Sequence, residues 1–201
     1  MFTGIVTDIG EVLEVAERAQ GLRGIAIGCR YDRSSIAVGA SIACAGVCLT
    51  VIEIDGAQGR TIFRADTAAE TLAVTTAGRW KVGTRLNLEQ ALKLGDELGG
   101  HLVNGHVDGI ATLIERDDLP DMARMRFRAP PLLSRFIAQK GSVAIDGVSL
   151  TINDVDRDTL SVLIIPHTLA VTTLGEMRVG DAANLEVDLM ARYAARLLEQ
   201  R

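Results

Sequence analysis

The chain has 201 residues and a formal net charge of −5 at neutral pH, and its lysines and arginines are scattered rather than clustered. This pattern offers no surface for nucleic acid or an anionic membrane, and no apolar run approaches the roughly 18 to 20 residues of a transmembrane helix. The first residues lack a basic segment ahead of an apolar core, and three cysteines are too few for a secreted disulfide framework. A soluble, cytoplasmic protein with a small polar ligand is expected.

In chain order, the first half predicts short strands separated by glycine-rich turns. The run from 39 to 54 is rich in β-branched residues and is interrupted by Gly46, which predicts a bent strand or a hairpin. Strands are expected over residues 3–17, 22–29, 39–54, 60–65 and 85–89, and helical turns over 34–39 and 68–72. Such a pattern, with little helix, is typical of a small antiparallel barrel.

Residues 90–100 lead into a second half that repeats the pattern, with no proline- or serine-rich linker between the halves. Strands are expected over residues 102–115, 122–129, 140–155, 159–165 and 184–187, and a short helix over 131–140. The last stretch, 189–201, is rich in helix formers and places Leu189, Tyr193 and Leu197 on one stripe. That helix either covers its own barrel or associates with other subunits.

The two halves are copies of one unit. Segment 41–51 recurs as 142–152 with a constant offset of 101, the same offset carries Gly4 onto Gly105, and from residue 70 onward the offset is 97. A period of about 100 residues exceeds the roughly 20 to 50 residues of solenoid repeats, so each copy is expected to be a small domain. Domains of this size bury little surface alone, which favours oligomerisation.

Cysteine and histidine spacing gives no sign of a disulfide or a metal site. Cys44 and Cys48 are four residues apart in an expected strand, so they would face the same side about 13 Å apart unless the chain bends sharply between them. The three histidines form no cluster with metal-ligand spacing. No metal ion is expected.

A duplicated fold most simply makes two copies of one pocket, which can hold two copies of one small molecule. Hydroxyl groups recur at equivalent positions, where the alternative role is a turn or backbone hydrogen bond: Ser41/Ser142, Thr50/Thr151, Thr71/Thr168 and Thr76/Thr173. Other positions change chemical type: Ile5/His106, Ala45/Asp146, Cys48/Ser149 and Glu70/His167. A pure binding duplication has no reason to equip only one copy in this way, so the divergent residues are expected to carry chemistry.

Five segments resemble riboflavin synthases of the alpha-chain type, and together they extend over essentially the whole chain in order. They are residues 1–6 (MFTGIV), 46–50 (GVCLT), 99–107 (GGHLVNGHV), 140–151 (KGSVAIDGVSLT) and 165–175 (IPHTLAVTTLG). The resemblance implies an all-β fold of two six-stranded Greek-key barrels, residues 1–97 and 98–187, followed by an oligomerisation helix, 188–201. It also implies a homotrimer with each active site between barrels of two subunits, and it allows an association with lumazine synthase.

The reaction that the resemblance implies is a dismutation that needs neither cofactor nor metal. Two molecules of 6,7-dimethyl-8-ribityllumazine exchange a four-carbon unit and give riboflavin and 5-amino-6-ribitylaminouracil. Because one compound is both donor and acceptor, the site must bind it twice in opposite orientations, which suits two related barrels. The residues that differ between the barrels are expected to decide which molecule donates.

The resemblance also carries site residues onto this sequence, motif by motif. Those expected to take part in catalysis are Ser41, Cys48, His106, Asp146 and Ser149, with His101 as a further polar group near the second ring. Those expected to line the surface of the first barrel are Gly4, Ile5, Val6, Cys48, Leu49, Thr50, Asp66, Thr67, Ala68, Ala69, Glu70 and Thr71. Those expected in the second barrel are Gly105, His106, Val107, Lys140, Ser149, Leu150, Thr151, Leu163, Ile164, Ile165, Pro166, His167 and Thr168.

Three positions depart from the family's pattern. Ala45 stands where members often carry Asn and Cys44 where some carry His, so neither is assigned a catalytic role. His167 stands where some members carry Glu, and either side chain can contact a ribityl hydroxyl or the pyrimidine edge.

Alternative interpretations remain for individual residues and for the whole chain. Cys48 could be a small buried hydrophobe, and His106 a core histidine satisfied by the backbone. The competing functions are a non-catalytic carrier of lumazine or flavin, and a flavin oxidoreductase. The carrier would tolerate decay of one pocket, whereas the oxidoreductase would need a nucleotide-binding domain with a glycine-rich strand-to-helix turn.

Overall fold

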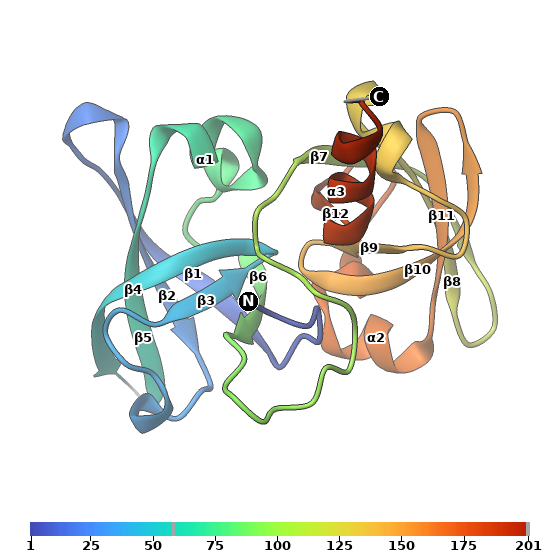
Figure 1. Cartoon of the computed structure of the whole chain (residues 1–201). Helices are drawn as coiled ribbons and strands as arrows, with labels where there is room; N and C mark the ends of the chain where they lie inside the picture. Colours follow the sequence, from blue (N-terminus) through green and yellow to red (C-terminus); the bar gives the residue numbers. More distant parts are fainter. Residues whose placement is uncertain (58, 200–201) are drawn as a thin grey trace.

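Two closed barrels lie side by side in the computed structural model, which describes residues 1–57 and 59–199 (Figure 1). Each barrel has six antiparallel strands, so the expected all-β, duplicated fold is confirmed. The strand order is β1-β2-β5-β4-β3-β6 around the first barrel and β7-β8-β11-β10-β9-β12 around the second. Because β5 and β11 each pair with a strand that is not their neighbour in sequence, the connections follow a Greek-key pattern.

The strands are separated by short helices and turns. The first barrel contains β1 (Asp8–Glu17), η1 (Ala19–Gly21), β2 (Arg23–Cys29), η2 (Arg33–Ser35), β3 (Ser41–Cys44), β4 (Val47–Ala57), β5 (Arg60–Thr67), α1 (Ala69–Val74), η3 (Thr76–Arg79) and β6 (Arg85–Gln90). The second contains β7 (Gly109–Asp118), β8 (Ala123–Arg128), η4 (Pro131–Phe136), β9 (Ser142–Ile145), β10 (Val148–Asp156), β11 (Thr159–Ile164), α2 (Pro166–Val171), η5 (Thr173–Glu176) and β12 (Ala182–Val187), and α3 (Leu189–Leu198) follows. The helix expected over 131–140 is confined to the 3₁₀ helix η4.

Both barrels begin later in the sequence than expected, because an irregular arm precedes the first strand of each. Strands were expected from residues 3 and 102, whereas β1 begins at Asp8 and β7 at Gly109. Gly4 and Gly105 have a φ of +75°, which a strand cannot contain. The arms, residues 1–7 and 101–108, are therefore free to leave their own barrels.

Two tight hairpins interrupt the long β-branched runs. Ala45 and Gly46 have φ values of +45° and +78°, and Asp146 and Gly147 have +44° and +79°. Positive φ at both central residues is the mark of a type I′ turn, which matches the twist of the flanking strands. The sharp bend that the sequence left open thus exists in both copies.

The hairpin also corrects the expectation that Cys44 and Cys48 share one face of a strand. Cys44 pairs with Val47 across the hairpin and packs in the barrel core, whereas Cys48 pairs with Ala43 and faces the other barrel. The two thiols therefore point to opposite sides of the hairpin. All three cysteines of the chain are unpaired.

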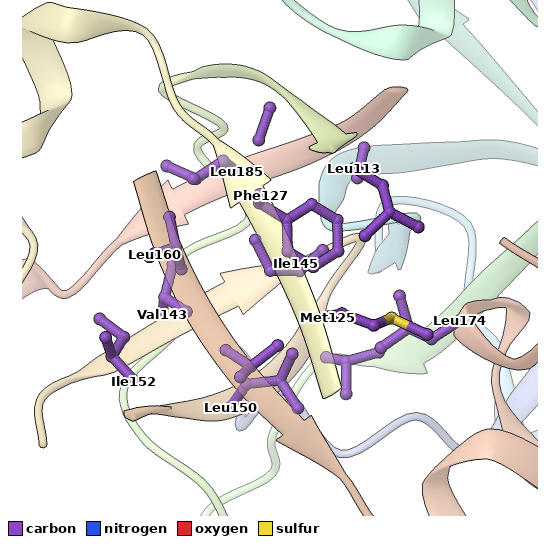
Figure 2. Packing of buried hydrophobic residues seen from close by; sticks show 14 of the residues in the cluster. Leu113, Met125, Phe127, Val143, Ile145, Leu150, Ile152, Leu160, Leu174 and Leu185 are labelled. Atoms are coloured by element: carbon purple, nitrogen blue, oxygen red, sulfur yellow. The ribbon is translucent and has the colours of Figure 1, made fainter. Parts of the chain in front are cut away.

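Each barrel closes around its own apolar core. Along β8, alternate residues point inward, and Met125 and Phe127 meet Leu113 of β7 and Ile145 of β9, all four fully buried (Figure 2). Phe63 of β5 is likewise fully buried in the core of the first barrel. Full burial of such side chains contributes about 1.5 to 3 kcal/mol each.

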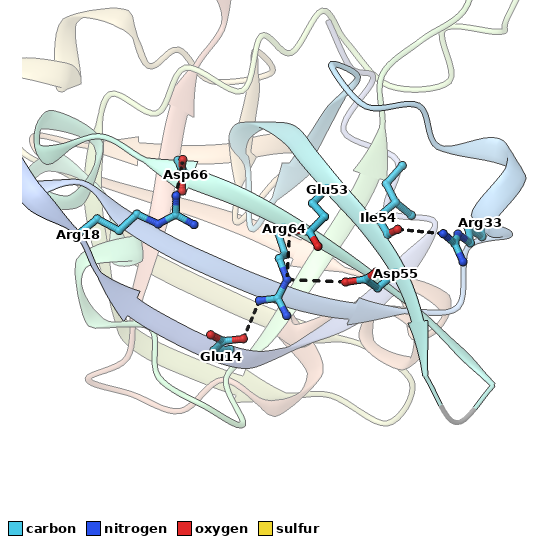
Figure 3. A network of polar contacts seen from close by, with 8 residues as sticks. All are labelled: Glu14, Arg18, Arg33, Glu53, Ile54, Asp55, Arg64 and Asp66. Atoms are coloured by element: carbon cyan, nitrogen blue, oxygen red, sulfur yellow. Dashed lines mark hydrogen bonds and ion pairs between the residues drawn. The ribbon is translucent and has the colours of Figure 1, made fainter.

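A surface arginine spans the bends that curve the first barrel. The registers of β1 and β4 each shift by one residue, just before Glu14 and just before Glu53. Arg64 of β5 reaches both carboxylates, at 2.6 Å and 3.8 Å (Figure 3). The second barrel makes the same contacts to Glu115 and Asp154, but its arginine, Arg126, comes from β8 rather than from β11.

The two barrels join around a pseudo-twofold axis. Phe2 pairs with its own repeat equivalent, Val103, and both are buried. The Asn87 amide donates to the Asp146 carbonyl and accepts from the Thr173 N–H, at 3.0 and 2.8 Å. Its equivalent, Asn184, does the same with the Ala45 carbonyl and the Thr76 N–H of the first barrel, so each buried asparagine binds both the hairpin and the 3₁₀ helix of the opposite barrel.

The C-terminal helix α3 lies against the second barrel through polar contacts (Figure 1). Arg192 binds the Asp108 carboxylate, and Arg135 of η4 binds Glu199. Tyr193 and Leu197, two residues of the expected apolar stripe, remain 59% and 69% exposed. None of the helices in residues 1–57 and 59–199 has the length and apolarity needed to cross a membrane.

The Asn184→Ala substitution should lower the free energy of unfolding by about 2 to 4 kcal/mol, because it strands a buried carbonyl and a buried N–H. These are the Ala45 carbonyl and the Thr76 N–H, now 2.8 and 2.7 Å from the Asn184 amide. Urea unfolding would measure the change, with Asn153→Ala, at an exposed position, as the control. A loss within about 0.5 kcal/mol, as for ordinary surface changes, would show that the asparagine link is dispensable.

Candidate functional site

The two arms cross, so that each completes a surface on the opposite barrel. The carbonyl of Gly4 accepts a hydrogen bond from the Ser149 N–H at 2.8 Å, and the carbonyl of Gly105 accepts one from the Cys48 N–H at 2.9 Å. Val6 packs against the core of the second barrel and Val107 against that of the first. Residues 4–6 and 105–107, expected to line the first and the second barrel respectively, thus each contact the opposite barrel.

The crossing requires glycine at both arm positions. A Cβ on Gly4 would lie 2.6 Å from the Ser149 Cβ, and a Cβ on Gly105 would lie 2.6 Å from the Cys48 Cβ. Both glycines also have a left-handed backbone, which L residues rarely adopt. The repeated glycine of the sequence is thus explained by a close approach between barrels.

The arms are anchored by two buried carboxylates that the sequence analysis did not select. Glu89 at the end of β6 binds the N–H groups of Thr3 and Gly4, and Glu186 of β12 binds the N–H of Asn104. The signal was present in the sequence, because Asn-Leu-Glu recurs at 87–89 and 184–186. Nothing in the sequence, however, indicated what these acids would contact.

His101 and Ser149 form the most chemically active pair in the described residues. The His101 Nδ1 and the Ser149 Oγ lie 2.7 Å apart, and the His101 Nε2 is buried without a partner among those residues. Burial lowers the pKa of His101, and the Asp188 carboxylate acts in the opposite direction. A neutral imidazole at this distance can take the proton of the serine hydroxyl, which is the arrangement of an activated nucleophile or a proton shuttle.

The expected binding residues of the first barrel meet where β4 and β5 separate. Ser41 is paired with Thr50 on the hairpin, and Val51 is paired with Ala65, so that Asp66 lies next to this edge. The Asp66 Oδ1 and the Thr67 Oγ1 are buried and have no hydrogen-bond partner in the described residues. Buried polar atoms are normally paired, so each of these unpaired oxygens, which lie on opposite faces of β5, marks a place where a polar ligand atom could bind.

A cleft of about 720 Å³ runs between the first strand of barrel one and helix α2 of barrel two. It brings together Val6 and His167, residues 161 positions apart in the sequence. Its lining residues are Val6, Thr7, Asp8, Ile9, Gly10, Glu11, Arg30, Arg60, Gly83, Arg85, His167, Ala170 and Val171. His106 and Lys140 lie outside this cleft, both exposed to solvent.

Asp146 occupies a different place from the other residues expected in catalysis. It sits in the hairpin turn at the barrel junction, where its Oδ1 accepts a hydrogen bond from the Asn184 N–H at 2.7 Å. Burial raises the pKa of Asp146 to about 7, against the effect of that N–H. The nearby cleft contains Ala45, Thr76 and Thr173, but not Ser149 or His101. The chain therefore separates Asp146 from the histidine–serine pair.

The described residues of this site include no set of side chains suited to binding a metal ion. Among residues 1–57 and 59–199, no three or more His, Cys, Asp or Glu side chains are grouped so that they could hold a metal ion. The polar groups on the arms and hairpins include hydroxyls, thiols, the imidazoles of His101 and His106, the Asn104 amide and backbone amides, beside the carboxylates of Asp108 and Asp146. Such groups suit hydrogen bonding to a neutral heterocycle and its polyol.

Comparison with known proteins agrees with this duplicated site. The family model of the lumazine binding domain matches residues 3–91 and again residues 104–188. The crystal structure of LumP complexed with riboflavin superposes with a TM-score of 0.82 at 24% identity, over 93% of this chain and 99% of that chain, and supports the fold. The chain is thus a protein of two lumazine binding domains.

Relatives that align over nearly the whole chain narrow the assignment. A riboflavin synthase of Brucella abortus is 52% identical over 99% of this chain and 98% of its own length. Those of Mycobacterium bovis and Photobacterium phosphoreum are 40% and 37% identical, each over 98% of this chain and over 98% and 89% of their own lengths. The chain belongs to the riboflavin synthase family.

Asp146→Asn should flatten the pH dependence of stability. The pKa of Asp146 is about 7 in the folded chain and about 3.9 in an unfolded one, so the folded state binds more protons between these values. Stability therefore falls as the pH rises through that window. Urea unfolding of the parent and of the Asp146→Asn variant from pH 4.5 to 8 isolates the contribution of Asp146, because the other buried acids are unchanged. Equal slopes would show that Asp146 titrates normally.

Proposed function

We propose that this protein is a riboflavin synthase that converts two molecules of 6,7-dimethyl-8-ribityllumazine into riboflavin and 5-amino-6-ribitylaminouracil. The observation that carries the proposal is the completeness of both half-sites, in a chain that aligns end to end with riboflavin synthases at up to 52% identity. Each half-site has a hairpin, a glycine arm and a recurring threonine. A carrier that holds one chromophore would have no need of both.

Positioning supplies much of the proposed catalysis. Two identical substrates held face to face react as if unimolecular, and in favourable cases this lowers the barrier by about 7 to 11 kcal/mol. The pseudo-twofold relation between the arms gives each substrate an equivalent cradle in the opposite orientation. The four-carbon transfer then needs only proton movements and a transient nucleophile.

The histidine–serine pair is the best candidate for these proton movements. His101, kept neutral by its lowered pKa, can accept a proton from Ser149 and return it later. Cys48 stands at the equivalent position on the other hairpin, and it lacks a comparable base because the repeat carries no second His101. The two half-sites thus offer different chemistry to the two substrates. No cofactor is required by these steps.

We further propose that the protein acts as a cytoplasmic homotrimer assembled through α3. Tyr193 and Leu197 are largely exposed while polar contacts hold the helix to its own barrel, which favours a second chain as the cover for the stripe. Three unpaired cysteines suit a reducing compartment. We also propose an association with lumazine synthase, whose product would be the substrate of this protein.

The purified protein should convert 6,7-dimethyl-8-ribityllumazine to riboflavin without any addition, because its own residues supply the positioning and the proton transfers. Product absorbance, followed with and without a chelator, would measure this. Tight binding of the lumazine without turnover would indicate a carrier. A loss of activity caused by the chelator would contradict a metal-free mechanism.

Deletion of residues 189–201 should turn the trimer into monomers whose barrels remain folded. The helix contributes exposed apolar area, worth about 25 cal/mol per Å² once covered. Sedimentation of the truncated chain would give its mass, and Leu197→Asp would serve as a milder variant that keeps the helix. An unchanged trimer in both variants would mean that the helix does not hold the subunits together.

A further inference from the structure

We propose that Glu89 and Glu186 are positioning residues, each of which sets the half-site of the opposite barrel, and that Thr3 and Asn104 make the two half-sites unequal in stiffness. The proposal rests on the proposed function where it concerns turnover. Neither glutamate was among the residues expected to touch a substrate. Both act through an arm that ends against the other barrel's hairpin.

Glu89 clamps the first arm with both of its oxygens. It is 6% exposed, its Oε1 accepts from the Thr3 N–H and Oγ1 at 2.6 and 2.7 Å, and its Oε2 accepts from the Gly4 N–H at 2.9 Å. The same Gly4 then accepts from the Ser149 N–H at 2.8 Å. An acid of barrel one thus makes three hydrogen bonds to the arm, and Gly4 of that arm makes a further hydrogen bond to the serine of barrel two.

Glu186 clamps the second arm less completely. It is 4% exposed, and its Oε1 accepts from the Asn104 N–H at 2.7 Å. Asn104 stands where the first copy has Thr3, so the hydroxyl donor is missing. The Glu186 Oε2 makes no well-aligned hydrogen bond in the described part of the chain, although the Gly105 N–H is near enough to lower the pKa of Glu186. Gly105, next along this arm, accepts from the Cys48 N–H at 2.9 Å.

The difference in donors has an energetic consequence. Burial raises the pKa of both acids, and in each case the neighbouring arm N–H groups act in the opposite direction. A buried carboxylate with an unpaired oxygen gains less from its partners than one with three direct donors. The arm of residues 1–7 is therefore held firmly against Ser149, and the arm of residues 101–108 is held less firmly against Cys48.

Two identical substrates thus meet half-sites of different stiffness. The firm half-site contains Ser149. Its partner His101 begins the other arm, where the His101 N–H is tied to the first arm by a 3.1 Å hydrogen bond to the Thr3 carbonyl. The softer half-site is completed by Gly105 and His106, farther along that arm. A displacement of about 1 Å in a positioning group can cost roughly a hundredfold in rate. The clamp that fixes Ser149 should therefore matter more for turnover than its counterpart.

The variants Glu89→Gln and Glu186→Gln form a matched pair for a test in the full-length protein. A glutamine at 89 has only one acceptor oxygen, and its other terminal group is an NH₂ donor. That NH₂ must face either the Gly4 N–H or the Thr3 donors, so the hydrogen bonds on one side of the clamp are lost. We expect hydrogen exchange of the peptide 1–7 to rise at least tenfold, with the barrel strands unchanged. Exchange of the peptide 101–108 should rise less for Glu186→Gln, and Asn104→Thr should slow it by adding the missing hydroxyl.

Turnover of 6,7-dimethyl-8-ribityllumazine supplies the second readout. Glu89→Gln should lower kcat at least tenfold while KM stays within threefold, and Glu186→Gln should lower kcat less. Hydrogen exchange that rises throughout the barrels would mean that Glu89 stabilises the whole fold, which would overturn the proposal. Equal effects of the two glutamine variants would overturn the proposed difference in stiffness between the half-sites. Exchange is measured without substrate, so a parent protein that fails to turn over would refute the proposed function and leave the clamp to be decided by exchange alone.

Discussion

Two backbone hydrogen bonds, from Cys48 to Gly105 and from Ser149 to Gly4, are the contacts on which the rest of the molecule depends. Each exists because a glycine stands where an added Cβ would lie only 2.6 Å from the Cβ of the facing residue, closer than two side chains can approach. Once the arms are crossed, neither barrel can present its hairpin without the other. Two domains of marginal size thereby become one unit, and the candidate half-sites arise at their junction.

The contacts of the junction are repeated on both sides of the pseudo-twofold axis. Asn87 and Asn184 each fill both amide functions with groups of the opposite barrel, and Phe2 and Val103 meet at the axis itself. Away from the axis the copies diverge freely. The arginine that ties down the strand bends comes from β5 in one barrel and from β8 in the other, yet it reaches equivalent acids. The ion pairs between an arginine and the acids at the strand bends are the same in both barrels, but the strand that supplies the arginine differs.

Asymmetry within this symmetric frame accounts for a directed reaction between identical molecules. Ser149 has the His101 imidazole at hydrogen-bond distance, whereas Cys48 at the equivalent position packs against the apolar cluster at the barrel junction. Thr3 and Asn104 add a second difference at the base of the arms. Both differences lie at single positions, so the duplicated fold could acquire them without disturbing its core.

The sequence by itself determined the duplication, the strand-rich composition and the family, because these follow from local periodicity and from recurring motifs. It also predicted Ser149, Cys48 and the two arm glycines as site residues, from the same recurring motifs. Only the tertiary structure decided which barrel each arm serves, that Asp146 lies apart from Ser149, and that Glu89 and Glu186 hold the arms. These are contacts between residues about 40 to 145 positions apart, and no local pattern encodes which of two equivalent barrels an arm will reach.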